Sequence, residues 1–248
     1  HTERMLKHNV QTIRVKKGKQ NLIEIKGKES LSPINISIPG DPSSASFYAA
    51  LCLLSKNSKV ILKQVHINPT RIGFFNIVRK HKGRISFKNK KNQGNEMVAD
   101  VHVASSKIRS LNVSEKFFVS CQDEFPLMFA MASLLPGTST FKGIEDLANK
   151  ESNRIKEMQK ILKQIGIKSF ASKNKMKIYG NPNLDIGNKT IAVSGVFDHR
   201  ILMSAAILSL LTGIKANLKN FEQVRTSCPN FLSTITTLGG KFETKKKN

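Results

Sequence analysis

The sequence has no tryptophan, only two tyrosines and few acidic residues, and these shortages narrow its possible functions. With 17 Asp and Glu against 41 Lys and Arg, the formal net charge is +24. Proteins that bind single-stranded nucleic acid stack bases on aromatic side chains set among cations, but aromatic residues make up only 6% of this chain and no basic stripe alternates with them. We therefore interpret the excess lysine as a solvated surface and expect no nucleic-acid partner.

Cysteines are also few, and no apolar run is long. Cys52, Cys121 and Cys228 have neither metal-ligand spacing nor a paired framework, which favours reduced thiols and a cytoplasmic setting. No run approaches the ~20 apolar residues that span a bilayer, and no signal peptide is visible, so we expect no membrane partner. The chain starts at His1, in a segment that is typical of a helix, and we expect further sequence upstream.

Three segments resemble one another at intervals of about 80 residues. Each begins with an aspartate and continues into an apolar run, and the three runs end at Leu54, Leu135 and Leu211. These runs are apolar on nearly every face, which predicts fully buried helices. Short alternating segments follow and predict strands; they are 59–63, 139–142 and 215–218.

A second, amphipathic helix is expected in each unit. The predicted ranges are 69–81, 150–165 and 229–238, ended by Gly83, Gly166 and Gly239 in the left-handed conformation. Further strands are predicted at 99–103 and 176–179. The pattern indicates an α/β fold in which repeats pack on one another.

This pattern also predicts a division of the chain. Residues 1–38 would end an upstream domain, 39–230 would form most of a second domain of three repeats, and 231–248 would form the last helix and a closing strand.

Charged clusters begin three of the predicted helices. They are Asp123-Glu124, Lys150-Glu151-Ser152-Asn153-Arg154 and Asp198-His199-Arg200. A cation in a first helical turn opposes the helix dipole, so its repetition indicates bound anions. Each cluster alone also fits surface ion pairs or helix caps, with Asn149 or Ser152 capping the middle helix and Asp198 the last. We expect Lys150 and Arg154, four residues apart, to share one helix face. Together the clusters suggest an enzyme for phosphorylated or carboxylated small molecules.

The order of these motifs resembles a known family. In sequence they are Pro39-Gly40-Asp41-Pro42-Ser43-Ser44, Asn68-Pro69-Thr70-Arg71, Asp123-Glu124-Phe125-Pro126, Lys150-Glu151-Ser152-Asn153-Arg154, Asp198-His199-Arg200-Ile201 and Thr226-Ser227-Cys228-Pro229. This series closely resembles the 5-enolpyruvylshikimate-3-phosphate synthases over the whole chain. The resemblance implies the enolpyruvyl transferase fold: two domains, each an inside-out α/β barrel of repeated βαβαββ units around three buried parallel helices, with the active site between them.

The resemblance also implies a reaction. The family transfers the enolpyruvyl group of phosphoenolpyruvate to the 5-hydroxyl of shikimate 3-phosphate and releases phosphate, in the shikimate pathway of aromatic amino acid biosynthesis. We expect a monomer that needs no metal or organic cofactor. The implied roles are Asp123 at the hydroxyl, Glu151 at the methylene carbon, Lys150 on shikimate 3-phosphate, Arg154 and Arg200 on phosphoenolpyruvate, and His199 in support of that clamp.

Two residues depart from the family pattern, and two alternative functions stay open. Asn153 stands where the family pattern has Asp, and Ala148 where it has Arg. The family's other phosphate-binding groups would lie upstream of His1, so we expect the chain alone to be inactive. The alternatives are an enzyme like UDP-N-acetylglucosamine enolpyruvyl transferase, and a basic remnant that binds anions or nucleic acid.

Overall fold

The computed structural model describes residues 2–9, 13–16, 22–25, 27, 28, 30, 33 and 35–244. The α-helices are α1 Thr2–Asn9, α2 Pro42–Leu54, α3 Gly73–Lys80, α4 Phe118–Cys121, α5 Phe125–Ser133, α6 Arg154–Gln164, α7 His199–Thr212 and α8 Phe231–Thr237. The strands are β1 Ile13–Lys16, β2 Leu22–Ile25, β3 Lys59–His66, β4 Arg84–Gln93, β5 Glu96–Ala104, β6 Asn112–Val113, β7 Gly137–Lys142, β8 Ser169–Ser172, β9 Lys175–Gly180, β10 Thr190–Val193 and β11 Lys215–Leu218. Short 3-10 helices are η1 Glu115–Phe117, η2 Gln122–Glu124, η3 Glu145–Asn149 and η4 Phe221–Thr226.

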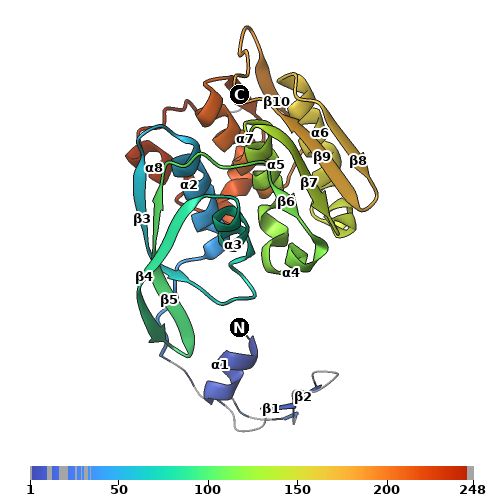
Figure 1. Cartoon of the computed structure of the whole chain (residues 1–248). Helices are drawn as coiled ribbons and strands as arrows, with labels where there is room; N and C mark the ends of the chain where they lie inside the picture. Colours follow the sequence, from blue (N-terminus) through green and yellow to red (C-terminus); the bar gives the residue numbers. More distant parts are fainter. Residues whose placement is uncertain are drawn as a thin grey trace.

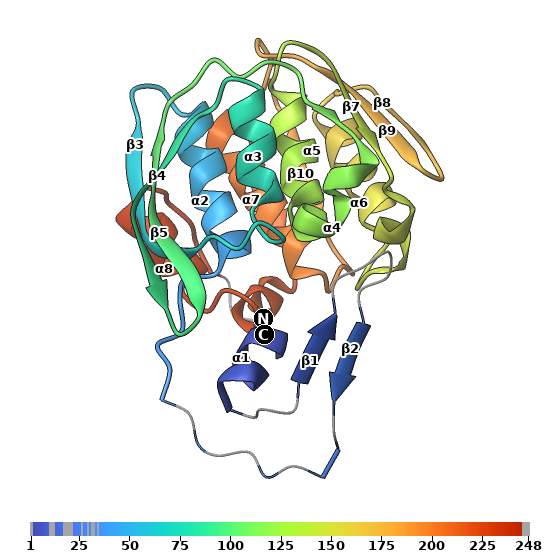
Figure 2. The same ribbon diagram turned by 60° about the horizontal axis from the view of Figure 1, so that its bottom comes forward.

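The three apolar runs form the buried helices α2, α5 and α7, which pack side by side (Figure 2). Local chemistry sets where two of them begin. The Asp41 carboxylate accepts the Ser44 N–H at 2.8 Å, with Pro42 as the first helical residue, and the Asp198 carboxylate accepts the Arg200 N–H at 2.9 Å. All nine residues of α5 are buried. The prediction of three buried helices is confirmed.

Sheets surround these helices on the outside (Figures 1 and 2). In each repeat, the segment before the buried helix pairs in parallel with the strand after it: Gly40 with Val65, β6 with β7, and β10 with β11. The first two repeats complete sheets ordered β3-β5-β4 and β6-β7-β9-β8. This arrangement of helices inside sheets confirms the α/β fold that the repeats predicted and the inside-out form that the family resemblance implied.

The third repeat is shorter within the described part of the chain. Its sheet contains only β10 and β11. The closing strand expected in 231–248 is not found over 238–244, and 245–248 lie outside the described residues. The division at residues 38 and 230 stays a prediction.

The second helices begin later than predicted. The helix expected from residue 150 starts at Arg154, because the side chain of Asn153 accepts the Lys156 N–H at 3.0 Å and caps it. Asn149 and Ser152 are therefore not its caps. Likewise α3 begins at Gly73 rather than Pro69.

Two of the three predicted glycine stops are correct. Gly166 and Gly239 have φ of +81° and +90°, in the left-handed region. After α3 the left-handed residue is Lys82, at φ +74°, so the prediction for Gly83 is wrong. A Cβ at Gly83 would lie 2.3 Å from Cγ1 of Val78, so close packing accounts for this glycine.

The N-terminal segment lies apart from the buried helices. It contains α1 and the antiparallel pair β1–β2 (Figure 1), and an ion pair from Arg4 to Glu96 joins α1 to β5. Among the described residues, no helix has the length and apolar character needed to cross a bilayer.

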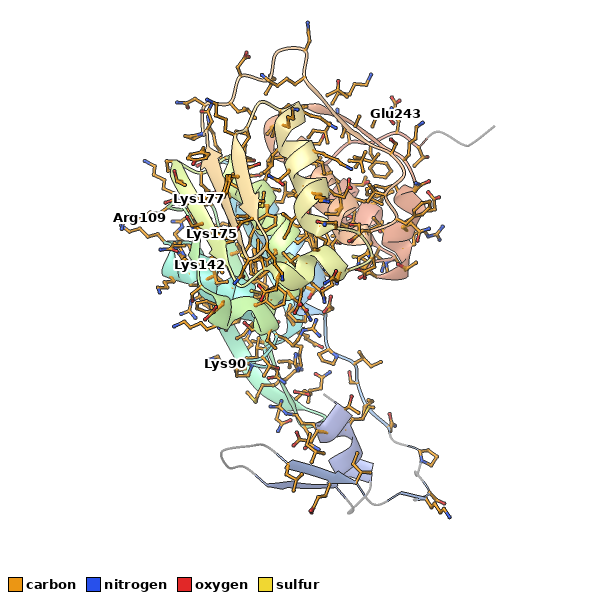
Figure 3. All side chains as sticks on the ribbon, turned by 90° about the vertical axis from the view of Figure 1, so that its right-hand side faces the viewer. Lys90, Arg109, Lys142, Lys175, Lys177 and Glu243 are labelled. Atoms are coloured by element: carbon orange, nitrogen blue, oxygen red, sulfur yellow. The ribbon has the colours of Figure 1, made fainter. Side chains whose placement is uncertain are left out.

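Lysines gather on the outer face of the second sheet. Lys142 of β7 pairs with Lys175 of β9, and Lys177 lies two residues further along the same face; Figure 3 shows all three on one side, near Arg109. Among the ion pairs of the described residues, none involves these four cations. This face accounts for part of the solvated positive charge that the composition predicts.

Asp100 connects two irregularities in the first sheet. The register shifts between Leu62 and Val65 on β3, and between Lys88 and Lys91 on β4, where Gln64 and Asn89 have φ near +50°. Such positive φ is strained for residues other than glycine. The Asp100 carboxylate accepts the Gln64 N–H at 3.0 Å and the Asn89 side-chain N–H at 2.8 Å, which stabilises both bulges.

We expect Asp100→Asn to weaken this sheet and to remove part of the acid sensitivity of folding. The Asn89, Gln64 and Lys63 contacts lower the pKa of Asp100 to about 2, below the usual value of about 4 for an unfolded chain. A depressed carboxyl pKa adds stability above pH 4 that is lost as the pH falls toward 2.

Urea midpoints at pH 7 and pH 3 measure this effect. The wild-type midpoint should fall further than that of the variant over this range. Asp185→Asn, at a carboxyl side chain that is 91% exposed, is the control and should behave like the wild type. Equal falls in all three proteins would contradict the role of Asp100.

Candidate functional site

The beginnings of four helices meet at one place, and the predicted charged clusters lie there. Arg200 of α7 is 3.8 Å from the carboxylate of Asp123, just before α5, and its guanidinium lies 6.0 Å from the ring centroid of Phe47 in α2. Arg154, the first residue of α6, reaches both Asp123 and Asp198. Because every helix N-terminus carries partial positive charge, this convergence favours anions.

Arg154 is the centre of the site. Its Nε donates to Asp198 at 2.9 Å, its Nη1 to Asp123 at 3.1 Å and its Nη2 to Glu151 at 2.6 Å. The side chain is 1% exposed. One buried guanidinium therefore orients three carboxylates from three segments of the chain.

Asp198 anchors this arrangement. It is fully buried, and one carboxylate oxygen accepts both Arg154 Nε and the Ser152 hydroxyl, at 2.9 and 3.0 Å. The other oxygen caps α7. The sequence predicted the cap correctly but gave no sign of the pairing with Arg154, because 44 residues separate the two.

Asp123 and Glu151 differ from Asp198 in that solvent can reach their carboxylates. Their side chains are 34% and 50% exposed, although both contact the buried Arg154. Burial raises the pKa of Asp123, but the charges of Arg200 and Arg154 outweigh burial and hold the pKa below its ordinary value. Asp123 is therefore ionised at neutral pH and able to accept a proton.

Arg200 has hydrogen-bond donors that no described residue uses. Its Nε and Nη1 are buried and have no hydrogen-bond partner among the described residues. Because unpaired buried N–H groups cost free energy, these two donors favour an incoming acceptor. The neighbouring His199 is half-buried, and burial together with the Arg200 charge lowers its pKa, so the imidazole is neutral at pH 7.

Lys150 reaches the site from a loop. It follows η3 in an extended conformation and donates to the Gln122 side chain at 2.8 Å. Since α6 begins only at Arg154, the prediction that Lys150 and Arg154 share a helix face is wrong. Gln122, Ser152 and Asp198 were not among the predicted site residues, although all three adjoin or belong to the charged clusters.

Arg71 extends the site toward α2. It donates to the Ser43 hydroxyl at 3.1 Å and lies 3.5 Å from the Asp41 carboxylate. The motifs at 41–44 and 68–71 are thus brought together with the three charged clusters. At the two departures from the family pattern, Asn153 caps α6 and Ala148 lies in η3.

Comparisons with known proteins agree on one family. The family described as EPSP synthase (3-phosphoshikimate 1-carboxyvinyltransferase) matches residues 1–235. A 3-phosphoshikimate 1-carboxyvinyltransferase of Zymomonas mobilis is 33% identical over 246 residues, which are 98% of this chain and 54% of that protein. One of Sphingopyxis alaskensis is 35% identical over 228 residues, covering 92% of this chain and 51% of that protein.

Solved structures give the same result. EPSP synthase from Acinetobacter baumannii superimposes with a TM-score of 0.85 at 30% identity, over 96% of this chain and 54% of that one. The enolpyruvyl transferase NikO from Streptomyces tendae shares the fold, with a TM-score of 0.68 at 12% identity over 92% of this chain and 50% of its own. The chain spans about half the length of the relatives it matches.

Replacement of Arg154 should be strongly destabilising. Arg154→Met would leave the fully buried Asp198 carboxylate without its cation, at an expected cost of about 3–5 kcal/mol in the free energy of unfolding. Lys156→Met, at an exposed position on the same helix, should change it by less than about 0.5 kcal/mol. Urea denaturation measures both values, and similar stabilities of the two variants would refute the anchoring role.

Proposed function

This chain belongs to the EPSP synthase family, and we propose that it supplies the proton-transfer side of an enolpyruvyl transferase active site. The proposed reaction joins the enolpyruvyl group of phosphoenolpyruvate to the 5-hydroxyl of shikimate 3-phosphate and releases phosphate. Because the chain spans about half of its relatives, the proposal is for the longer protein of which it would form a part.

The observation that carries the proposal is the pairing of Asp123 and Glu151 on one guanidinium. Addition of a hydroxyl across the enolpyruvyl double bond removes a proton from oxygen and adds one to the methylene carbon. Elimination of phosphate then takes a proton back from that carbon. Such chemistry needs two fixed acid–base groups that substrates can reach. Asp123 and Glu151 are partly exposed, while Arg154 between them is buried and held by Asp198.

The two carboxylates then have different roles. We assign Asp123 to the hydroxyl proton, because its lowered pKa keeps it ionised and ready to accept. Glu151 serves the methylene carbon, where a proton must be both given and taken. Its 50% exposure leaves room for a substrate beside it.

The cations would hold the substrates. The unpartnered N–H groups of Arg200 favour the carboxylate or phosphate of phosphoenolpyruvate, whose geometry a guanidinium matches. Lys150, extended toward Gln122, would contact the hydroxyls of shikimate 3-phosphate. Arg154 is occupied by carboxylates here, so its contact with phosphoenolpyruvate and the supporting role of His199 stay predictions from the family.

Stabilisation in this scheme comes from charges that are already in place before the reaction. We therefore expect no metal or organic cofactor. We also propose that the protein works in the cytoplasm as a monomer.

Glu151→Gln should abolish most of the turnover. In the longer protein that carries this chain, loss of this acid–base group should lower phosphate release by about 10²–10⁴-fold. Glu157→Gln, one turn along α6 and paired with Lys160 at 2.7 Å, is the matched control and should keep near wild-type turnover. Equal rates in both variants would overturn the role of Glu151, and a folded protein without any release would favour a non-catalytic remnant.

Substrate competition distinguishes the two transferase alternatives. Phosphate release from phosphoenolpyruvate should require shikimate 3-phosphate, and UDP-N-acetylglucosamine should neither replace nor inhibit it. Release that depends on the nucleotide sugar instead would identify the other enzyme. The 248-residue chain alone should release no phosphate. The relatives it matches are about twice as long, and the proposed reaction needs the part that this chain does not contain.

A further inference from the structure

Glu124 is a buried acid that the proposed reaction does not use. It directly follows Asp123, caps no helix with its side chain, and is 2% exposed. Its Oε1 has no hydrogen-bond partner among the described residues. A carboxylate in such a position is costly unless nearby charge balances it.

The groups around Glu124 are the cations of the anion site. The Ser43 hydroxyl of α2, Arg200 of α7 and Arg71 before α3 act on its carboxyl, and Asp123 and Cys121 are its charged or titratable neighbours along the chain. Arg71 also donates to the Ser43 hydroxyl at 3.1 Å. An unpaired acid oxygen and the unpaired Nε and Nη1 of Arg200 thus occupy the same buried region.

Charge balance at the site depends on Glu124. Without Glu124, the site has equal numbers of positive and negative side chains. The four cations are Arg71, Lys150, Arg154 and Arg200, and the four carboxylates are Asp41, Asp123, Glu151 and Asp198. An ionised Glu124 adds a negative charge that Arg200 and Arg71 partly balance. An anion bound at Arg200 would take up part of the positive charge that stabilises the Glu124 carboxylate. It would therefore disfavour the ionised form of Glu124.

We propose that Glu124 is a positioning residue that takes up a proton from solvent when an anion occupies Arg200. The proton removes the repulsion between the buried carboxylate and the anion, and it leaves the Arg200 donors to the ligand. The inference rests on the proposed function only in placing an anion at Arg200.

Asp123 and Glu151 are less suited than Glu124 to take up a proton when an anion binds. Asp123 is held ionised by Arg200 and Arg154, and Glu151 is half exposed to water. Burial raises the pKa of Glu124 to about 7; Asp123 adds to the rise, and Ser43, Arg200 and Arg71 oppose it. Glu124 can therefore gain a proton near neutral pH. Burial raises the pKa of Cys121 well above its usual range, and burial with the Arg200 charge lowers the pKa of His199, so neither group accounts for a change between pH 7 and 9.

Sulfate is a suitable probe because it does not titrate near neutral pH. Its dissociation constant for the 248-residue chain can be followed by NMR shifts from pH 7 to 9 at constant ionic strength. If sulfate raises the pKa of Glu124 by one unit, linkage predicts binding about fivefold weaker at pH 9 than at pH 7. Glu124→Gln mimics the protonated acid and should abolish this dependence, so that the variant binds sulfate as tightly at pH 9 as at pH 7.

Two further variants keep the test decisive. Asp185→Asn removes an exposed carboxylate outside the site and should leave the pH dependence intact. Arg200→Gln should abolish sulfate binding in a chain that is still folded.

A direct measurement supplements the binding curves. The ¹³C carboxyl signal that disappears in Glu124→Gln should titrate near pH 7 in chloride and at higher pH in sulfate. A midpoint below pH 5, an equal midpoint in both salts, or a pH dependence that persists in Glu124→Gln would overturn the proposal. Because no substrate is used, these results are independent of whether phosphate release is found.

Discussion

The ion pairs of Arg154 are the interaction on which the rest of the site depends. A guanidinium that is 1% exposed binds the fully buried Asp198, and the same group fixes Asp123 and Glu151. Removing one member of a buried ion pair costs more than the pair contributes, because the remaining charge stays desolvated. Stability and the placement of both acid–base groups are therefore tied to one side chain. This explains why a cation can stand at the start of α6 against the helix dipole.

The buried helices make this arrangement possible. Since α2, α5 and α7 are apolar on nearly every side, they pack together, and the segments before α5 and α7 bring Asp123, Glu124 and Asp198 to one place. The sheets outside exclude water from the helix sides but leave the helix beginnings partly open. Charged side chains therefore concentrate at these N-termini, where partial positive charge and partial exposure together favour anionic ligands. Glu124 is buried among them, and burial raises its pKa to about 7.

Two acids of the site are partly open to solvent, and the chain spans about half the length of its relatives. The chain covers 54% of the Zymomonas mobilis and Acinetobacter baumannii relatives, and two catalytic candidates, Asp123 and Glu151, lie partly open to solvent. Under the proposed function, a domain covering this face would strengthen each electrostatic contact by excluding water. The lysines Lys142, Lys175 and Lys177 lie on the second sheet, and the proposed reaction assigns them no role.

The sequence by itself determined the repeats, the buried helices, the cap at Asp198 and the family, because these follow from local periodicity and from short motifs. It also pointed to the charged clusters. Only the tertiary structure decided that Arg154 pairs with Asp198 across 44 residues, that Lys150 lies off the helix, and that Glu124 is buried beside Arg200. The physical reason is that the electrostatics of a side chain depend on what packs around it, and the packing of distant segments is not encoded in the spacing of any single motif.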